Sequence, residues 1–181
     1  AWKADTDWYA SLAVMSVVSG GMAGHCTVPV WLRTGRRPSM MRSQQAMNAA
    51  QVQALIRMGL PMAEDIDFRV ERLDERHALA RIPFHGKLVR PGGTLSGPTI
   101  MALADAAMYA VILGRLGAVE MAVTSNLNIN FLSKPRPEDL LAEASILKLG
   151  RRQVVCEVGV FSQSNEEDLV AHVTGTYALP L

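Results

Sequence analysis

One carboxylate, Asp105, interrupts the run of small apolar residues GPTIMALADAAMYAVIL that begins at Gly97. After Pro98 this run has no glycine or proline and is rich in Ala, Leu and Met, which predicts a buried helix over 97–113. A carboxylate buried without a partner costs several kcal/mol or takes up a proton, and the helical neighbours of Asp105 offer no cation. Asp105 therefore needs a partner from elsewhere in the fold, or it serves a functional pocket.

The stretch PGGTLSG before this helix could supply a second chemical group. Ser96 or Gly97 is predicted to cap the helix, with Pro98 in the first turn. The Gly97 N–H then has no intrahelical acceptor and lies at the positive end of the helix dipole, so it can hold the oxygen of a carbonyl or an oxyanion. The plain alternative is a tight turn that needs glycines. A phosphate-binding P-loop is excluded, since Gly-Lys-Ser/Thr is absent.

Gly97 and Asp105 are too far apart to act together within one helix. Eight positions correspond to roughly 12 Å along a helix axis. Two such helices packed antiparallel about a two-fold axis would bring Gly97 of one chain near Asp105 of the other, and would do so twice. The spacing therefore implies a dimer with two shared sites.

Composition favours small-molecule chemistry. Lys and Arg number 18 against 17 Asp and Glu, which gives a formal net charge of +1 and no basic excess for nucleic acid or a membrane surface. Cys26 and Cys156 lie far apart, and Cys156 alternates with valines as a buried thiol would. The four histidines are scattered without metal-ligand spacing. We expect a reducing, cytoplasmic location and no metal.

The chain of 181 residues is predicted to contain one domain after an N-terminal extension. Residues 1–42 have no periodic pattern, and their apolar run is too short for a membrane span. We expect a disordered extension there, with a targeting segment as the alternative, and a single domain over 43–181.

The order of elements within 43–181 predicts an α+β fold. An amphipathic helix over 43–59, with Ala46, Ala50, Leu55 and Met58 near helical spacing, is followed by two strands with a turn near Asp74 and Glu75. The long helix comes next, and then four strand-like runs joined by tight turns. A mostly antiparallel sheet around one central helix fits this order, because a doubly wound parallel sheet needs helices between its later strands.

The motifs GGTLSGPTIMALADAAM, VTSNLNINFLSKP and LKLGRRQVVCEVGVF together resemble the hotdog-fold thioesterases, and specifically the PaaI-like acyl-CoA thioesterases of phenylacetate degradation. The resemblance covers residues from about 44 to 179. It implies a hotdog fold, hydrolysis of an acyl-CoA or aryl-acyl-CoA thioester, and a homodimer or a homotetramer. Coenzyme A is then part of the substrate, and no separate cofactor is implied.

The resemblance also implies roles for individual residues. Gly97 matches the oxyanion-hole glycine, Asp105 the catalytic aspartate contributed across the dimer as general base or nucleophile, and Thr124 a residue that places the attacking water. Thr124 reaches the site only if its strand face points there or if the strand bulges. The candidates for substrate binding are Ser96, Met101, Met108, Lys134, Arg136, Arg151 and Arg152. The four cations are candidate contacts for the coenzyme A phosphates or solvated turn residues, and the two methionines line an acyl pocket or fill the core.

Two departures from the family pattern keep other functions open. Many relatives have His-Gly-Gly where this chain has Ser96-Gly97-Pro98, and some have Asn in place of Arg90. The main alternative is a non-catalytic acyl-CoA-binding protein on the same scaffold. An enoyl-CoA hydratase is disfavoured, because it would pair an Asp with a nearby His, and the chain has no histidine between His85 and His172.

Overall fold

The computed structural model describes residues 46–180 of the chain. Two short helices, α2 (Ala49–Gly59) and α3 (Pro61–Asp65), precede the first strands. The remaining elements are β1 (Arg69–Leu73), β2 (His77–Ile82), η1 (Gly86–Leu88), β3 (Val89–Arg90), β4 (Thr94–Leu95), α4 (Gly97–Leu116), β5 (Val123–Phe131), β6 (Leu140–Leu149), β7 (Gln153–Ser162) and β8 (Asn165–Ala178). The expected extension over 1–42 lies outside the described residues.

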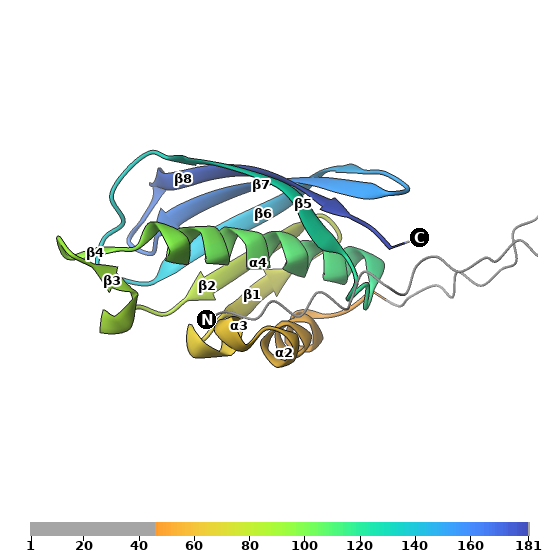
Figure 1. Ribbon diagram of the computed structural model, residues 1–181, viewed down its shortest axis with the longest axis horizontal. Coiled ribbons are helices and arrows are strands. Elements are labelled where there is room, and N and C mark those ends of the chain that lie inside the picture. Colours follow the sequence, from red (N-terminus) through yellow and green to blue (C-terminus); the bar gives the residue numbers. More distant parts are fainter. Residues whose placement is uncertain (1–45, 181) are drawn as a thin grey trace, which may run out of the picture. The chain divides into compact units, whose positions relative to one another are not determined.

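Six strands form one antiparallel sheet in the order β1-β2-β6-β7-β8-β5, and this sheet curves around α4 (Figure 1). The α+β architecture with an antiparallel sheet around a long central helix is therefore confirmed. The two-stranded pair of β3 and β4 leads directly into the start of α4. Because β5 is an edge strand, it carries backbone groups that no described strand pairs on its outer side.

The helix α4 provides the centre of the core. Twelve of its residues are buried, and its apolar character all round is what a helix enclosed by a sheet requires. By length and composition alone α4 could cross a membrane, but most of it is buried inside the protein, as is usual for a core helix. It ends at Leu116, and the residue that caps it, Gly117, has a φ of 81° and donates its N–H to the carbonyl of Leu113.

The first predicted helix is shorter than expected, and its buried face was predicted wrongly. Asn48 caps α2, so residues 46–48 are not helical. The buried residues are Val52 and Ile56, whereas Met58 is 80% exposed. The spacing of apolar residues did not identify this face, because the packing of α2 against β1 and α4 selects it.

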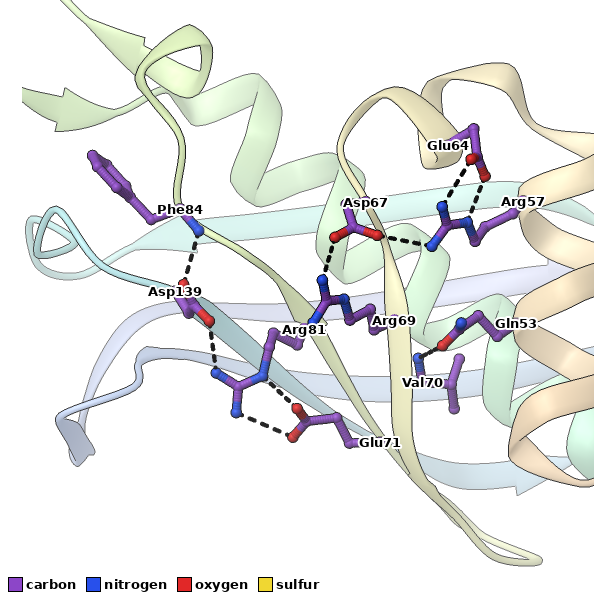
Figure 2. Close-up of polar contacts among 10 residues, drawn as sticks. All are labelled: Gln53, Arg57, Glu64, Asp67, Arg69, Val70, Glu71, Arg81, Phe84 and Asp139. Carbon is purple, nitrogen blue, oxygen red and sulfur yellow. Dashed lines mark hydrogen bonds and ion pairs between the residues drawn. The ribbon is translucent and has the colours of Figure 1, made fainter.

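A network of ion pairs connects α2 and α3 to the first strands (Figure 2). Arg57 on α2 binds Glu64 and Asp67, and Asp67 also binds Arg69. On β2, Arg81 pairs with Glu71 and with Asp139, whose other oxygen accepts the backbone N–H of Phe84. The contacts form two separate clusters: the first ties both short helices to β1, and the second ties the β5–β6 connection to β1 and β2.

Candidate active site

Asp105 is half-buried in the middle of α4, and two hydroxyl groups satisfy one of its oxygens. The Thr124 hydroxyl donates to Asp105 Oδ1 over 2.8 Å, and the Tyr177 hydroxyl donates to the same oxygen over 2.8 Å. No described residue donates a hydrogen bond to Oδ2. The structure thus supplies the partner that the buried carboxylate needed, while leaving one of its oxygens available for chemistry.

A β-bulge brings Thr124 to Asp105. The register of β5 against β8 shifts between Thr124, which lies opposite Tyr177, and Asn126, which lies opposite Thr176. Ser125 is the extra residue, and its hydroxyl donates to the Thr176 carbonyl instead. Without the bulge, strict alternation would have placed Ser125 on the inner face with Leu127. The condition attached to Thr124, that its strand bulges, is therefore met.

Tyr177 is the residue of this cluster that sequence reasoning missed. It lies on β8 and is only 4% exposed, and its ring stacks on Tyr109 with centroids 5.9 Å apart and planes 8° from parallel. Burial, and then the negative charge of Asp105, raise the pKa of Tyr177 well above its usual value. The hydroxyl therefore keeps its hydrogen. Alternation in VTGTYAL does place Tyr177 inward, and a buried tyrosine hydroxyl requires a hydrogen-bond partner.

Gly97 is the first residue of α4, as predicted, and Ser96 is its cap. The Ser96 hydroxyl accepts from the Thr99 N–H and lies 2.8 Å from the Thr99 hydroxyl. The Gly97 N–H donates to no described residue, as expected for the first turn of a helix. The ring of Phe131, at the end of β5, covers the glycine: a Cβ at Gly97 would lie 3.5 Å from its Cζ.

The four candidate cations fall into two separate groups. Lys134 and Arg136 lie between β5 and β6, where the Pro135 carbonyl accepts from the Thr94 hydroxyl near the start of α4. The second pair, Arg151 and Arg152, lies in the turn at the opposite end of β6. Because a ten-residue strand spans roughly 33 Å, the two pairs cannot reach one phosphate group within one chain.

The second pair lies at the Asp105 side of the molecule. Gln153, the next residue, pairs with Ala178 beside Tyr177, and the Arg152 carbonyl accepts the Leu179 N–H. The chain therefore has one end with Gly97, Lys134 and Arg136, and another with Asp105, Thr124 and the two adjacent arginines.

The two candidate methionines differ in position. Met101 is 40% exposed, whereas Met108 is fully buried, and a Cβ at Gly175 would lie 2.6 Å from its Sδ. Met108 is thus a core residue in this structure, and of the two only Met101 reaches the surface.

Two surface hollows lie away from these candidate residues. Their volumes are about 210 and 400 Å³, and they are lined by residues of the β1–β2 hairpin and by the last residues of β6. Neither hollow includes Gly97, Asp105 or Thr124.

Comparisons with known proteins agree with the fold and the motifs. Residues 92–168 match the model of the thioesterase superfamily. A structure of a protein classed as a thioesterase from a Silicibacter species is 34% identical, with a TM-score of 0.69, and the match covers 77% of this chain and 97% of that one.

Two further relatives are more distant. A protein classed as an esterase from Saccharolobus solfataricus is 30% identical over 115 residues, which are 63% of this chain and 74% of that protein. A mutant of the phenylacetic acid degradation protein PaaI from Thermus thermophilus is 27% identical, with a TM-score of 0.58, over 65% of this chain and 97% of that one.

Proposed function

The chain belongs to the hotdog-fold thioesterase superfamily, in its PaaI-like branch, and on this premise we propose that it hydrolyses an acyl-CoA or aryl-acyl-CoA thioester to the free acid and coenzyme A. The observation that carries this proposal is the Asp105 carboxylate, which two hydroxyls hold through Oδ1 while Oδ2 accepts from no described residue. Such a carboxylate is positioned to act on water or on a thioester carbon.

The reaction can be written with Asp105 as general base. Water transfers a proton to Oδ2 of Asp105 as its oxygen attacks the thioester carbonyl carbon, and the Gly97 N–H stabilises the resulting oxyanion. When the intermediate collapses, the carbon–sulfur bond breaks and the proton passes from Asp105 to the leaving sulfur. Because the Thr124 hydroxyl donates its hydrogen to Asp105, its oxygen lone pairs remain free to accept a hydrogen bond from the second hydrogen of the water. In the nucleophilic alternative Oδ2 itself attacks the carbonyl carbon, the carbon–sulfur bond breaks and coenzyme A leaves as the thiolate. Water then hydrolyses the acyl-enzyme anhydride, which regenerates the Asp105 carboxylate and releases the acid.

We propose that each site is shared between two chains. Within one α4, Gly97 and Asp105 are separated by roughly 12 Å. The edge strand β5 has Thr124 beside Asp105 and Phe131 beside Gly97. Antiparallel pairing of two β5 edges about a two-fold axis would place the Gly97 end of one chain against the Asp105 end of the other. The proposed assembly is a homodimer, with a homotetramer as a larger form.

The same two-fold arrangement gives the cations a role. Lys134 and Arg136 of one chain would lie at the same composite site as Arg151 and Arg152 of the other, so both pairs are proposed phosphate contacts for coenzyme A. Met101 is a proposed contact for the acyl group, since it is exposed one turn from the Gly97 end of the helix.

A cytoplasmic location without a metal or redox group completes the proposal. The reaction needs only a carboxylate, hydroxyls and an N–H. Burial raises the pKa of the Cys156 thiol to about 12, which makes it an inert core residue that suits a reducing compartment.

A turnover assay with free-thiol detection tests the proposed activity on short-chain, long-chain and aryl acyl-CoA substrates. Asp105→Asn is expected to lower kcat by about 10² or more with little change in KM, because the carboxylate acts on the reacting atoms. Glu75→Gln, at an exposed carboxylate that pairs with Arg115, is the matched control and should leave both constants unchanged. Saturable binding of acyl-CoA without turnover would instead support the non-catalytic binding protein.

A further inference from the structure

The hydroxyl of Tyr177 reaches Asp105 from a strand that is 72 positions away in the sequence. It lies 2.8 Å from Oδ1 and 3.1 Å from the backbone carbonyl oxygen of the same residue. A tyrosine hydroxyl has a single hydrogen, so the shorter contact to the carboxylate takes it. Tyr177 therefore touches the carboxylate and the helix backbone that carries it.

Because both hydroxyls donate to the same oxygen, the two oxygens of the Asp105 carboxylate have different roles. Thr124 and Tyr177 both donate to Oδ1, and hydrogen bonds to a charged acceptor are stronger and more directional than neutral ones. Their combined effect is to fix the rotation of the carboxylate plane and to occupy Oδ1. Oδ2 is then the oxygen with free lone pairs.

The position of the Tyr177 ring is itself fixed. It packs on Tyr109, which follows Asp105 by one helical turn, so that α4 carries both the carboxylate and the ring that supports its partner. A ring that is buried and stacked loses little further freedom when it forms a hydrogen bond. This rigidity suits a group that must hold another side chain in one geometry.

We propose that Tyr177 is a positioning residue of the active site: its hydroxyl holds Asp105 Oδ1, so that Oδ2 is presented as the oxygen that reacts. The inference rests on the proposed thioesterase function. It differs from a purely structural role, in which Tyr177 would only satisfy a buried acceptor.

Tyr177→Phe tests the proposal, because it removes the hydroxyl and keeps the ring stacked on Tyr109. Thr124 still satisfies Oδ1, so the variant should fold with a Tm close to that of the wild type. The expected result is a fall of about tenfold in kcat, as for loss of a hydrogen bond to a charged group, with KM unchanged within about twofold. Ser133→Ala is the matched control: its hydroxyl binds the Leu169 carbonyl and not Asp105, so kcat should not change.

A double-mutant cycle separates positioning from structure. In an Asp105→Asn background no carboxylate remains to be positioned, so adding Tyr177→Phe should lower the residual single-turnover rate no further. Two results would overturn the inference about Tyr177 without affecting the proposed function. In the first, Tyr177→Phe lowers the rate by the same factor in the wild-type and Asp105→Asn backgrounds. In the second, Asp105→Asn is inactive but Tyr177→Phe does not lower the rate of the wild type. If the wild type hydrolyses no thioester, or if Asp105→Asn is fully active, the proposed function or its site fails instead.

Discussion

Glycine at position 97 could be required by the fold or by the proposed chemistry, and the structure distinguishes these two reasons. Its backbone is helical and needs no left-handed conformation, and an added Cβ would meet the Phe131 ring at 3.5 Å, which is ordinary van der Waals contact. The fold therefore does not require glycine at this position. The proposed chemistry does, because a side chain would fill the space beside the N–H that is to hold the oxyanion.

Gly97→Ala is accordingly expected to keep or raise stability, by up to about 1 kcal/mol, because alanine restricts the unfolded chain. The same change should lower kcat, and Gly97→Val should lower it further, since the branched side chain has to displace Phe131. Steady-state kinetics and thermal unfolding measure the two effects separately. Gly59→Ala, at a helical glycine with nothing within 4 Å of its Cβ, is the control for activity. Full activity in Gly97→Val would exclude the oxyanion role.

At the scale of elements, a β-bulge and a helix cap position the residues of the candidate site. The bulge at Ser125 turns Thr124 inward, and the Ser96 cap fixes where α4 starts. On the opposite edge of the sheet, Asp67 joins α3 to β1 with a φ of 51°, and its carboxylate binds Arg57 and Arg69 (Figure 2). Asn tolerates this left-handed backbone as well as Asp does, so the charge can be removed alone.

Asp67→Asn is expected to lower Tm by about 2 °C near pH 6, and the difference should vanish under acid conditions. Arg69 holds the pKa of Asp67 below its usual value, against partial burial and with help from Arg57. A carboxylate with a lowered folded-state pKa stabilises the protein above its unfolded pKa of about 3.9, and this contribution is lost as pH falls through the folded-state pKa.

Thermal unfolding of both proteins from pH 6 down to about pH 2.5 measures this difference. Glu167→Gln, at an exposed carboxylate without an ion pair among the described residues, is the matched control and should leave Tm close to that of the wild type. A Tm difference for Asp67→Asn that is constant with pH would show that charge is not the cause.

At the scale of the whole molecule, one chain presents two half-sites that do not meet. Gly97 and Phe131 lie at one end of β5, and Asp105, Thr124 and Tyr177 lie at the other. The exposed edge of β5 joins the two ends, and Phe131 at its end is 52% exposed. A second copy related by a two-fold axis would complete both sites at once.

Mixing two inactive variants is expected to restore activity. Asp105→Ala and Gly97→Val are each prepared as inactive dimers and then unfolded and refolded as an equal mixture. Random pairing makes half of the dimers mixed, and each mixed dimer holds one intact and one doubly defective site, so about a quarter of all sites should recover. Turnover per site measures the recovery.

The control for this mixture is that each variant refolds alone to a dimer of normal size. If dimers form but no activity returns, each site draws both residues from one chain, and the shared-site proposal is wrong.

Much of the fold could be predicted from local pattern. Alternation in the later part of the chain predicted β5 to β8, and the apolar run after Gly97 predicted α4, which extends three residues further than expected. The isolation of Asp105 among apolar residues predicted that it needs a partner. These features are periodicities and compositions of short segments, which burial imposes directly on the order of residues.

Only the tertiary structure decided which residues meet. The pairing of Tyr177 with Asp105, the bulge that brings in Thr124, and the choice of Val52 and Ile56 as the buried face of α2 all depend on packing between distant segments. Register and packing are properties of pairs of elements, and the pattern within one element leaves them open.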